Sequence, residues 1–281
     1  MEHISSPAQI KEIMRQHNLI FHKGLGQNFL YDAHFLNQIV ASAELTKEDI
    51  VLEIGPGLGV LTTRMAEQAK KVIAVEIDGG IVPVLENLTA PFGNVEIINR
   101  DILKTDLNEI LPEGEKVKVV ANLPYYITSP IIMKLLEECD RISCIVIMIQ
   151  KEVADRIVAL PGSKDYSALS VAVQFYSDPE KKVIVPAGAF VPPPKVDSAV
   201  LRLDIPESPK FAPDNQKTFF KTVKAAFGQR RKTLANGLST GFPELGKARI
   251  KEIIAECGFP ETVRGETLSI PEFIKISNLL K

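Results

Sequence analysis

The chain has 281 residues, of which 45% are hydrophobic and 24% are charged, which is typical of a globular protein with one large domain or two modest ones. Its net charge of −2 excludes a globally basic nucleic-acid binder, so RNA or DNA would have to contact local basic patches. The three cysteines have neither metal-ligand spacing nor the even number of a disulfide framework, and no apolar run is long enough for a signal peptide or a membrane span. We therefore expect a cytoplasmic protein that binds no metal and no membrane.

The N-terminal segment predicts a short amphipathic helix that begins at Pro7 and places Ile10, Ile13 and Met14 on one side. Residues 24–30, G-L-G-Q-N-F-L, follow as a polar turn before a further helix. By themselves these residues indicate no function.

Short, continuous apolar runs then alternate with helical patterns, as expected for strands that are buried on both faces. They are residues 50–54, 72–77, 95–98, 117–121 and 144–149. The alternation predicts right-handed βαβ units and a parallel sheet. Two later strands, 182–185 and 199–203, flank the stiff loop V-P-P-P-K at 191–195 and suit an antiparallel hairpin that closes the sheet edge. Such a hairpin favours an α/β fold with a methyltransferase sheet over a dehydrogenase sheet.

Proline and polar residues interrupt the apolar pattern near residues 205–209. Beyond them only helical periodicity is visible, over 215–227, 230–238, 247–257 and 271–280. We therefore expect two domains, an α/β domain at 1–205, which includes an N-terminal helical extension at 1–48, and a small all-helical domain at 206–281.

A glycine turn, G-P-G-L-G at 55–59, follows the first strand. Glycines let the backbone approach a ligand closely, and the next helix offers free N–H groups, although a tight packing turn would read the same way. The spacing departs from G-x-G-x-x-G, which argues against NAD. Glu76 ends the second strand, where a carboxylate can accept both hydroxyls of a ribose. Asp101 ends the third and either accepts the amino hydrogens of a cofactor adenine or caps a helix.

The tetrapeptide N-L-P-Y at 122–125 ends another strand. An amide oxygen, carbonyls stiffened by a proline and an aromatic face are what a planar base with an exocyclic amine needs. Together with the glycine turn, the tetrapeptide predicts the transfer of a methyl group from S-adenosylmethionine to the amino group of a nucleobase.

Five segments carry a resemblance to a known family: residues 24–30, the glycine turn with Glu76 and Asp101, N-L-P-Y, residues 190–198 and residues 226–234. In this order the chain resembles the ribosomal RNA adenine dimethyltransferases, specifically their bacterial small-subunit (KsgA-type) branch. The resemblance implies a Rossmann-like S-adenosylmethionine-dependent methyltransferase with a small helical C-terminal domain. It further implies dimethylation of two adjacent adenosines in a hairpin loop near the 3′ end of small-subunit ribosomal RNA, during maturation of the small subunit. The implied partners are this RNA and the immature small ribosomal subunit, and we expect a monomer.

The resemblance also places site residues by position. The cofactor residues that it implies are Gln27, Asn28, Leu30, Gly55, Gly57, Glu76, Ile77, Asp101, Ile102 and Asn122. The catalytic residues that it implies are Asn122, Leu123, Pro124, Tyr125 and Phe190. Tyr125 would stack on the target base and Phe190 would cover its other side, the alternative for Phe190 being core packing at a strand end. Tyr126 is expected to be structural, because adjacent residues of an extended segment face opposite ways.

Between Asp214 and Glu244 there is no acidic residue. On a helix, Lys217, Lys221 and Lys224 share one face, opposite Phe219, Phe220, Val223 and Phe227. Such a stripe is commonly a solvated face, but the absence of acids favours phosphate contact. The residues expected to contact RNA are Lys23, Lys195, Lys221, Lys224, Arg230, Arg231 and Lys232. Single-stranded or looped RNA offers its bases to such a site.

Three alternatives remain at this stage. The macrolide-resistance branch of the same family dimethylates large-subunit RNA, although N-L-P-Y and the basic Q-R-R-K segment at 229–232 fit the small-subunit branch better. A NAD-dependent oxidoreductase is disfavoured by G-x-G-x-G. A non-catalytic ribosome-assembly factor is disfavoured by the intact N-L-P-Y.

Overall fold

The chain divides into two compact units in a computed structural model that describes residues 4–20, 24, 26–229 and 231–280. The first unit comprises residues 1–154 and 178–205, and the second comprises 155–177 and 206–281. The sequence predicted one boundary at 205, whereas segment 155–177 joins the C-terminal helices. The reason is apolar packing: Phe175 of α8 (Ala168–Tyr176) lies against Phe219 of α9 (Gln216–Gly228), with ring centroids 4.8 Å apart.

A seven-stranded sheet forms the centre of the first unit, with the strand order β4-β3-β2-β5-β6-β9-β7. The strands are β2 (Ile50–Ile54), β3 (Lys71–Glu76), β4 (Val95–Asn99), β5 (Val117–Asn122), β6 (Ile142–Gln150), β7 (Asp178–Val185) and β9 (Ser198–Asp204). Strands β2 to β6 pair in parallel, as their apolar runs predict. Strand β9 is antiparallel to both β6 and β7. The late pair therefore closes the sheet with the last strand inserted inside the edge, and β7 is the edge strand.

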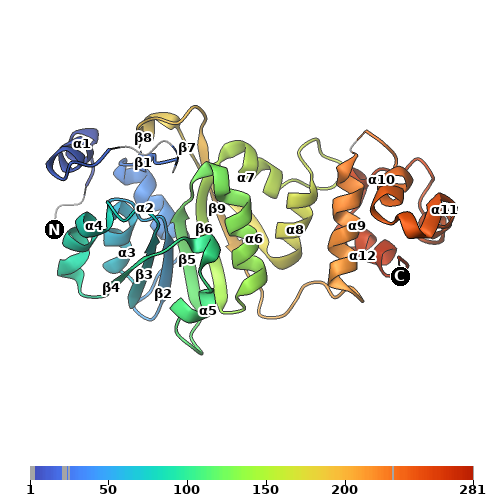
Figure 1. Ribbon diagram of the computed structural model, residues 1–281, viewed down its shortest axis with the longest axis horizontal. Coiled ribbons are helices and arrows are strands. Elements are labelled where there is room, and N and C mark those ends of the chain that lie inside the picture. Colours follow the sequence, from blue (N-terminus) through green and yellow to red (C-terminus); the bar gives the residue numbers. More distant parts are fainter. Residues whose placement is uncertain (1–3, 21–23, 25, 230, 281) are drawn as a thin grey trace. The chain divides into compact units, whose positions relative to one another are not determined.

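Helices cover the sheet because its strands are apolar on both faces: Val146 and Ile147, which point to opposite faces of β6, are both fully buried. Helices α2 (Ala33–Ser42), α3 (Val60–Ala66) and α4 (Val82–Thr89) share one core cluster, and α6 (Thr128–Glu138) packs against β6 (Figure 1). The unit also contains α5 (Leu107–Ile110), most of α7 (Lys151–Ile157) and the 3-10 turns η2 (Ala90–Phe92), η3 (Ile102–Lys104), η4 (Tyr125–Ile127) and η5 (Ala187–Ala189).

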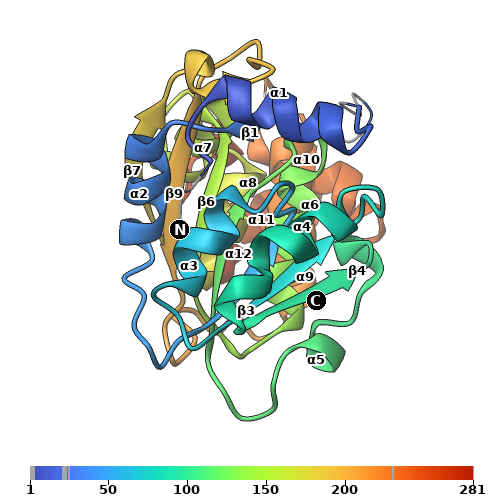
Figure 2. The same ribbon diagram turned by 90° about the vertical axis from the view of Figure 1, so that its left-hand side faces the viewer.

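A small antiparallel sheet, which the sequence did not predict, joins β1 (Phe29–Leu30) to β8 (Phe190–Val191). Helix α1 (Pro7–Gln16) lies beside it (Figure 2). This helix begins where predicted, because Ser6 accepts a hydrogen bond from the Gln9 N–H at 3.3 Å and Pro7 occupies the first turn. Its buried Ile10 and Met14 join the core cluster of β1 and β8. These contacts hold α1 against the small sheet of β1 and β8.

The second unit is helical in its described residues (Figure 1, α8 in yellow-green and α9 to α12 in orange to red). Besides α8 and α9 it contains α10 (Leu234–Gly241), α11 (Gly246–Glu256), α12 (Ile270–Ser277), η6 (Pro243–Leu245) and η7 (Gly265–Thr267). The helix expected at 230–238 begins only at Leu234, because Thr233 has an extended conformation and Lys232 N donates to Gln229 O at 2.8 Å in a turn. No helix in the part of the chain that the structure describes is long and apolar enough to cross a membrane.

Candidate active site

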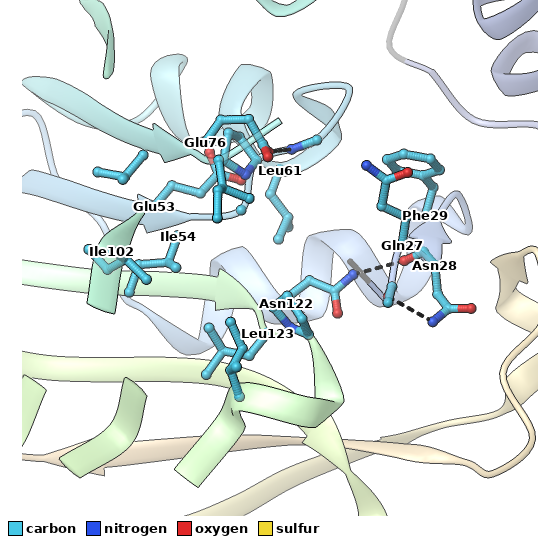
Figure 3. A pocket seen from close by; sticks show the side chains of 18 of the residues that line it. Gln27, Asn28, Phe29, Glu53, Ile54, Leu61, Glu76, Ile102, Asn122 and Leu123 are labelled. Atoms are coloured by element: carbon cyan, nitrogen blue, oxygen red, sulfur yellow. Dashed lines mark hydrogen bonds between the residues drawn. The ribbon is translucent and has the colours of Figure 1, made fainter. Parts of the chain in front are cut away.

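A pocket opens at the carboxyl ends of β2, β3 and β5, where ligands bind in open α/β sheets (Figure 3). All ten residues expected to contact a cofactor line it: Gln27, Asn28, Leu30, Gly55, Gly57, Glu76, Ile77, Asp101, Ile102 and Asn122. The residues of N-L-P-Y, Asn122 to Tyr125, line it as well. The structure therefore brings two sequence motifs about seventy residues apart into one cavity.

The glycine turn shapes the floor of this pocket. Gly57 has a φ of +56°, and a Cβ atom there would lie 2.7 Å from the ring of Phe29. No side chain fits this position without displacing Phe29. The Gly57 N–H donates to Glu76 Oε2 at 3.0 Å, so the turn and the end of β3 form one structure.

Glu76 is only 5% exposed, and both of its carboxylate oxygens accept backbone hydrogen bonds: Oε2 from Gly57, and Oε1 from Asp78 N–H at 2.9 Å. Burial raises the pKa of Glu76 above its ordinary value, although these N–H groups favour the charged form. A carboxylate offers about four acceptor positions, so two backbone bonds leave capacity for ligand hydroxyls. The side chain is rigid and suited to hold a ribose.

Glu53 is a site residue that the sequence analysis missed. It lies within β2, lines the pocket, is 2% exposed, and its Oε2 accepts a hydrogen bond from Thr62 Oγ1 at 2.6 Å. Burial raises the pKa of Glu53 to about 8, the Thr62 hydrogen bond acts against this rise, and the neighbouring Glu76 adds to it. Glu53 is therefore mainly protonated at pH 7. The signal was a single carboxylate inside the apolar strand I-V-L-E-I.

Asn122 is held by the segment that precedes β1 (Figure 3). Its Nδ2 donates to Asn28 O at 3.2 Å, and Asn28 Nδ2 donates to Gly26 O at 3.1 Å. Gln27 Nε2 in turn donates to Asp78 Oδ2 at 2.8 Å, so this segment is tied to the ends of both β5 and β3. The Asn122 Oδ1 atom has no hydrogen-bond donor among the described residues, which leaves it as an acceptor in the pocket.

The carbonyls of Leu123 and Pro124 differ in their hydrogen bonds. Pro124 O accepts from Ile127 N at 3.2 Å and from Thr128 Oγ1 at 3.1 Å, which fills its two lone pairs. The Leu123 N–H donates to Met148 O at 3.1 Å, while no donor to Leu123 O is found in the described ranges. Of the two carbonyls, Leu123 O is therefore the one available to a substrate.

The remaining predicted site residues differ in whether they line the pocket. Asp101 lines the pocket and also caps η3, since its Oδ1 accepts from Leu103 N at 3.0 Å. Its capping role is confirmed, and its contact with a cofactor adenine stays a prediction. Phe190 is 2% exposed, belongs to the core and does not line the pocket. The structure therefore places Phe190 as a packing residue of β8 and gives no support to its expected position over the base.

Among the residues expected to contact RNA, Lys195 is exposed in the loop between β8 and β9. Lys23 and Arg230 lie outside the described residues.

In the second unit, Lys217, Lys221 and Lys224 are exposed along α9 as predicted. The expectation that no carboxylate offsets their charge is wrong for Lys221, whose Nζ lies 3.4 Å from Glu244 Oε1 and 4.1 Å from the ring centroid of Phe242. Chain reversal after α10 brings Glu244 back to α9. Arg231 and Lys232 are exposed in the turn before α10, not on a helix. Outside the masked positions, no ion pair of Lys217, Lys224, Arg231 or Lys232 is found.

Several further pocket residues were not predicted from the sequence, namely Phe29, Leu61 and Arg100, and Tyr126, which was expected to be structural, lines the pocket as well. Asp78 was also not predicted from the sequence, because it acts through hydrogen bonds to two pocket residues, Glu76 and Gln27. The residue types next to a motif carry no local signal that they line a pocket, so only the folded chain identifies them.

Comparisons with known proteins agree with this geometry. The model of the family "Ribosomal RNA adenine dimethylase" matches residues 18–280. The chain is 50% identical to "Ribosomal RNA small subunit methyltransferase A" of Alkaliphilus oremlandii, over 100% of this chain and 99% of that protein. A crystal structure of a dimethyladenosine transferase from Plasmodium falciparum is similar with a TM-score of 0.77 and 29% identity, covering 88% of this chain and 95% of that one. The crystal structure of the 23S rRNA methyltransferase ErmE is similar with a TM-score of 0.69 and 27% identity, covering 90% and 99%.

The fold of these two structures is that of S-adenosylmethionine-dependent methyltransferases, which agrees with the strand order and with the pocket of the first unit. The family match covers nearly the whole chain and includes every pocket residue. The chain belongs to the ribosomal RNA adenine dimethylase family.

Proposed function

We propose that this protein transfers methyl groups from S-adenosylmethionine to the exocyclic amines of two adjacent adenosines in a hairpin loop near the 3′ end of small-subunit ribosomal RNA. The observation that carries the proposal is the fixed acceptor pair, Asn122 Oδ1 and Leu123 O, in the same pocket as the glycine turn and Glu76. The identity of 50% to a protein named for the small subunit, against 27% to a protein named for 23S rRNA, favours the small-subunit RNA.

The residues of the pocket fit the methyl donor. Glu76 would accept the ribose hydroxyls, Ile77 and Ile102 would flank the adenine, and the backbone at Gly55 and Gly57 would lie beside the methionine portion. The fit rests on Gly57, where a Cβ atom would meet Phe29, and on the remaining acceptor capacity of the buried Glu76. S-adenosylmethionine supplies a methyl group on a positively charged sulfur; the protein residues orient the two reactants.

The amine of adenine is a weak nucleophile because its lone pair is delocalised into the ring. Two acceptors, Asn122 Oδ1 and Leu123 O, would accept hydrogen bonds from its N–H groups. These hydrogen bonds would favour a tetrahedral nitrogen whose lone pair is free to attack. The hydrogen bond from Asn122 Nδ2 to Asn28 O holds the Asn122 amide, and the hydrogen bond from Thr128 Oγ1 to Pro124 O holds the turn that follows Leu123. Both acceptors are therefore oriented before substrate binds. The nitrogen loses its proton readily after attack, so no strong base is required.

Tyr125 is half-buried in the pocket, and its ring would stack on the extruded base. Stacking of about 1–3 kcal/mol per base is comparable with the few kcal/mol that extrusion costs. Lys217, Lys224, Arg231 and Lys232, together with Lys195, would contact phosphates, and Lys23 and Arg230 remain predicted contacts of the same kind. We further infer that the protein acts as a monomer on the immature subunit in the cytoplasm.

The test is incubation of the purified protein with S-adenosylmethionine labelled in its methyl group and with small subunits that lack the modification, followed by nucleoside analysis. The expected product is dimethyladenosine in small-subunit RNA. Label in naked large-subunit RNA alone would instead favour the macrolide-resistance branch, and no transfer to either RNA would favour a non-catalytic assembly factor. Sedimentation of the protein alone tests the monomer.

A further inference from the structure

Tyr126 is an exposed aromatic residue that lines the base pocket, and the proposed chemistry gives it no role. Its side chain is 55% exposed, although it lines the same cavity as Asn122 and Tyr125. Throughout the described ranges, its ring and hydroxyl make no hydrogen bond and no aromatic contact. Single exposed apolar side chains are common, but this ring stands at the opening of a ligand pocket.

The backbone explains why Tyr126 does not turn into the core. In an extended segment it would face away from Tyr125, but both residues lie in the 3-10 turn η4. Neighbouring side chains of a 3-10 helix are about 120° apart rather than opposite. Both tyrosines therefore line the pocket, one half-buried and one exposed.

The Tyr126 ring has a fixed backing. Gly26 has a φ of +63°, and a Cβ atom there would lie 3.3 Å from Tyr126 Cδ1 and 3.8 Å from Pro124 Cβ. Glycine at this position lets the ring rest against the backbone of the segment that also holds Asn122. The protein backbone thus lies next to one side of the ring and limits its movement, which lowers the entropy cost of stacking a ligand on the ring.

We propose that Tyr126 is a second stacking platform, which holds the nucleobase adjacent to the adenosine whose amine reacts. The inference rests on the proposed function. Extruding a base from a strand removes a stacking partner from the neighbouring base. An aromatic side chain can replace that partner, because every base has a π-face on which it can stack. Tyr125 and Tyr126 have Cα atoms about 3.8 Å apart, so one turn supplies a platform for the target and another for the next base.

The test compares wild type with Tyr126→Phe, Tyr126→Leu and Tyr126→Ala. The measurements are the dissociation constant for small subunits lacking the modification, the affinity for S-adenosylmethionine, and the methylation of each adenosine by wild type. Phe keeps the aromatic face, whereas Leu keeps apolar bulk on Gly26 without it. We expect Phe to bind subunits as wild type does, and Leu and Ala to bind about 5- to 140-fold more weakly, which is about 1–3 kcal/mol of stacking at 1.4 kcal/mol per tenfold.

Ile184→Ala is the matched control, since Ile184 is an exposed apolar residue of β7 in the same unit that does not line the pocket. Subunit binding by Tyr126→Leu within twofold of wild type overturns the inference. So does an equal loss of cofactor affinity in Tyr126→Leu, which would assign the ring to packing on Gly26. If wild type itself transfers no methyl group, the proposed function fails. The methylation assay detects this failure independently of the two binding results that would overturn the role of Tyr126.

Discussion

The hydroxyl oxygens of Tyr125 and Ser198 lie 2.6 Å apart, within hydrogen-bond distance. Ser198 is fully buried at the start of β9, so the ring that would stack on the target base is anchored at its far end by a strand 73 residues away. Burial raises the pKa of the Tyr125 hydroxyl, although the Ser198 hydrogen bond lowers it, so the hydroxyl stays protonated near neutral pH.

We therefore predict that Tyr125→Phe and Ser198→Ala each lower the single-turnover methylation rate by about 2- to 12-fold, the range of one neutral hydrogen bond. The double variant should be no slower than the slower single variant, because both changes remove the same contact. Cofactor affinity, measured by calorimetry, should stay unchanged in all three. Multiplicative losses in the double variant would show that Ser198 acts elsewhere.

Asn122→Ala should lower the single-turnover rate about 100-fold or more, since it removes an acceptor that is used mainly as the amine rehybridises. Asn122→Asp keeps an acceptor but loses the Nδ2 donor to Asn28 O, so its loss should be smaller than that of Ala. Rates on bound RNA within about twofold of wild type would remove Asn122 from the mechanism.

Glu76→Ala should weaken S-adenosylmethionine binding by about 10- to 100-fold, as expected from losing hydrogen bonds to a charged acceptor. Because Glu76 also accepts from Gly57 and Asp78, part of the loss comes from loosening the glycine turn. Glu76→Gln keeps one acceptor and should fall between Ala and wild type. Calorimetry tests the series, with the free energy of unfolding as the control for the fold, and an unchanged affinity in Ala contradicts the assignment.

Glu53 makes the stability of the protein depend on pH. Its pKa rises from an ordinary value of 4.5 to about 8 in the folded state, mainly through burial. Between these values the folded chain binds more protons than the unfolded chain, so the free energy of unfolding falls as pH rises through this window.

Glu53→Gln should lose this decline, which urea unfolding at pH 5 and pH 8.5 measures in both proteins. Glu48→Gln is the control, since Glu48 is exposed in the same unit. The same pH dependence in wild type and Glu53→Gln would show that Glu53 is ionised throughout.

The basic residues of α9 should differ in their contribution to RNA binding. Replacing Lys217 and Lys224 together by Ala should reduce the slope of log K against log salt by roughly 0.7–0.9 for each lost phosphate contact. Lys221→Ala should change the slope less, because Glu244 already pairs with Lys221. Lys247→Ala, an exposed lysine of α11, is the control. An unaltered slope in the double variant would show that this face of α9 contacts only solvent.

Much of the first unit was predictable from the sequence. The apolar runs of β2 to β6, the glycine turn, Glu76 and N-L-P-Y are local patterns, and their order along parallel strands places their ends at one edge of the sheet. The family resemblance then supplied the identity of the ligands, which periodicity alone does not contain.

Contacts between distant segments were decided only by the tertiary structure. The pairing of β1 with β8 buries Phe190, the return of η6 brings Glu244 to Lys221, and the apolar face of α8 draws residues 155–177 into the second unit. None of these contacts changes the local pattern of the residues that make them. The chain must fold before Asn28 reaches Asn122, 94 residues away, and before Ser198 reaches Tyr125, because a hydrogen bond depends on the distance between atoms in space and not on their spacing in the sequence.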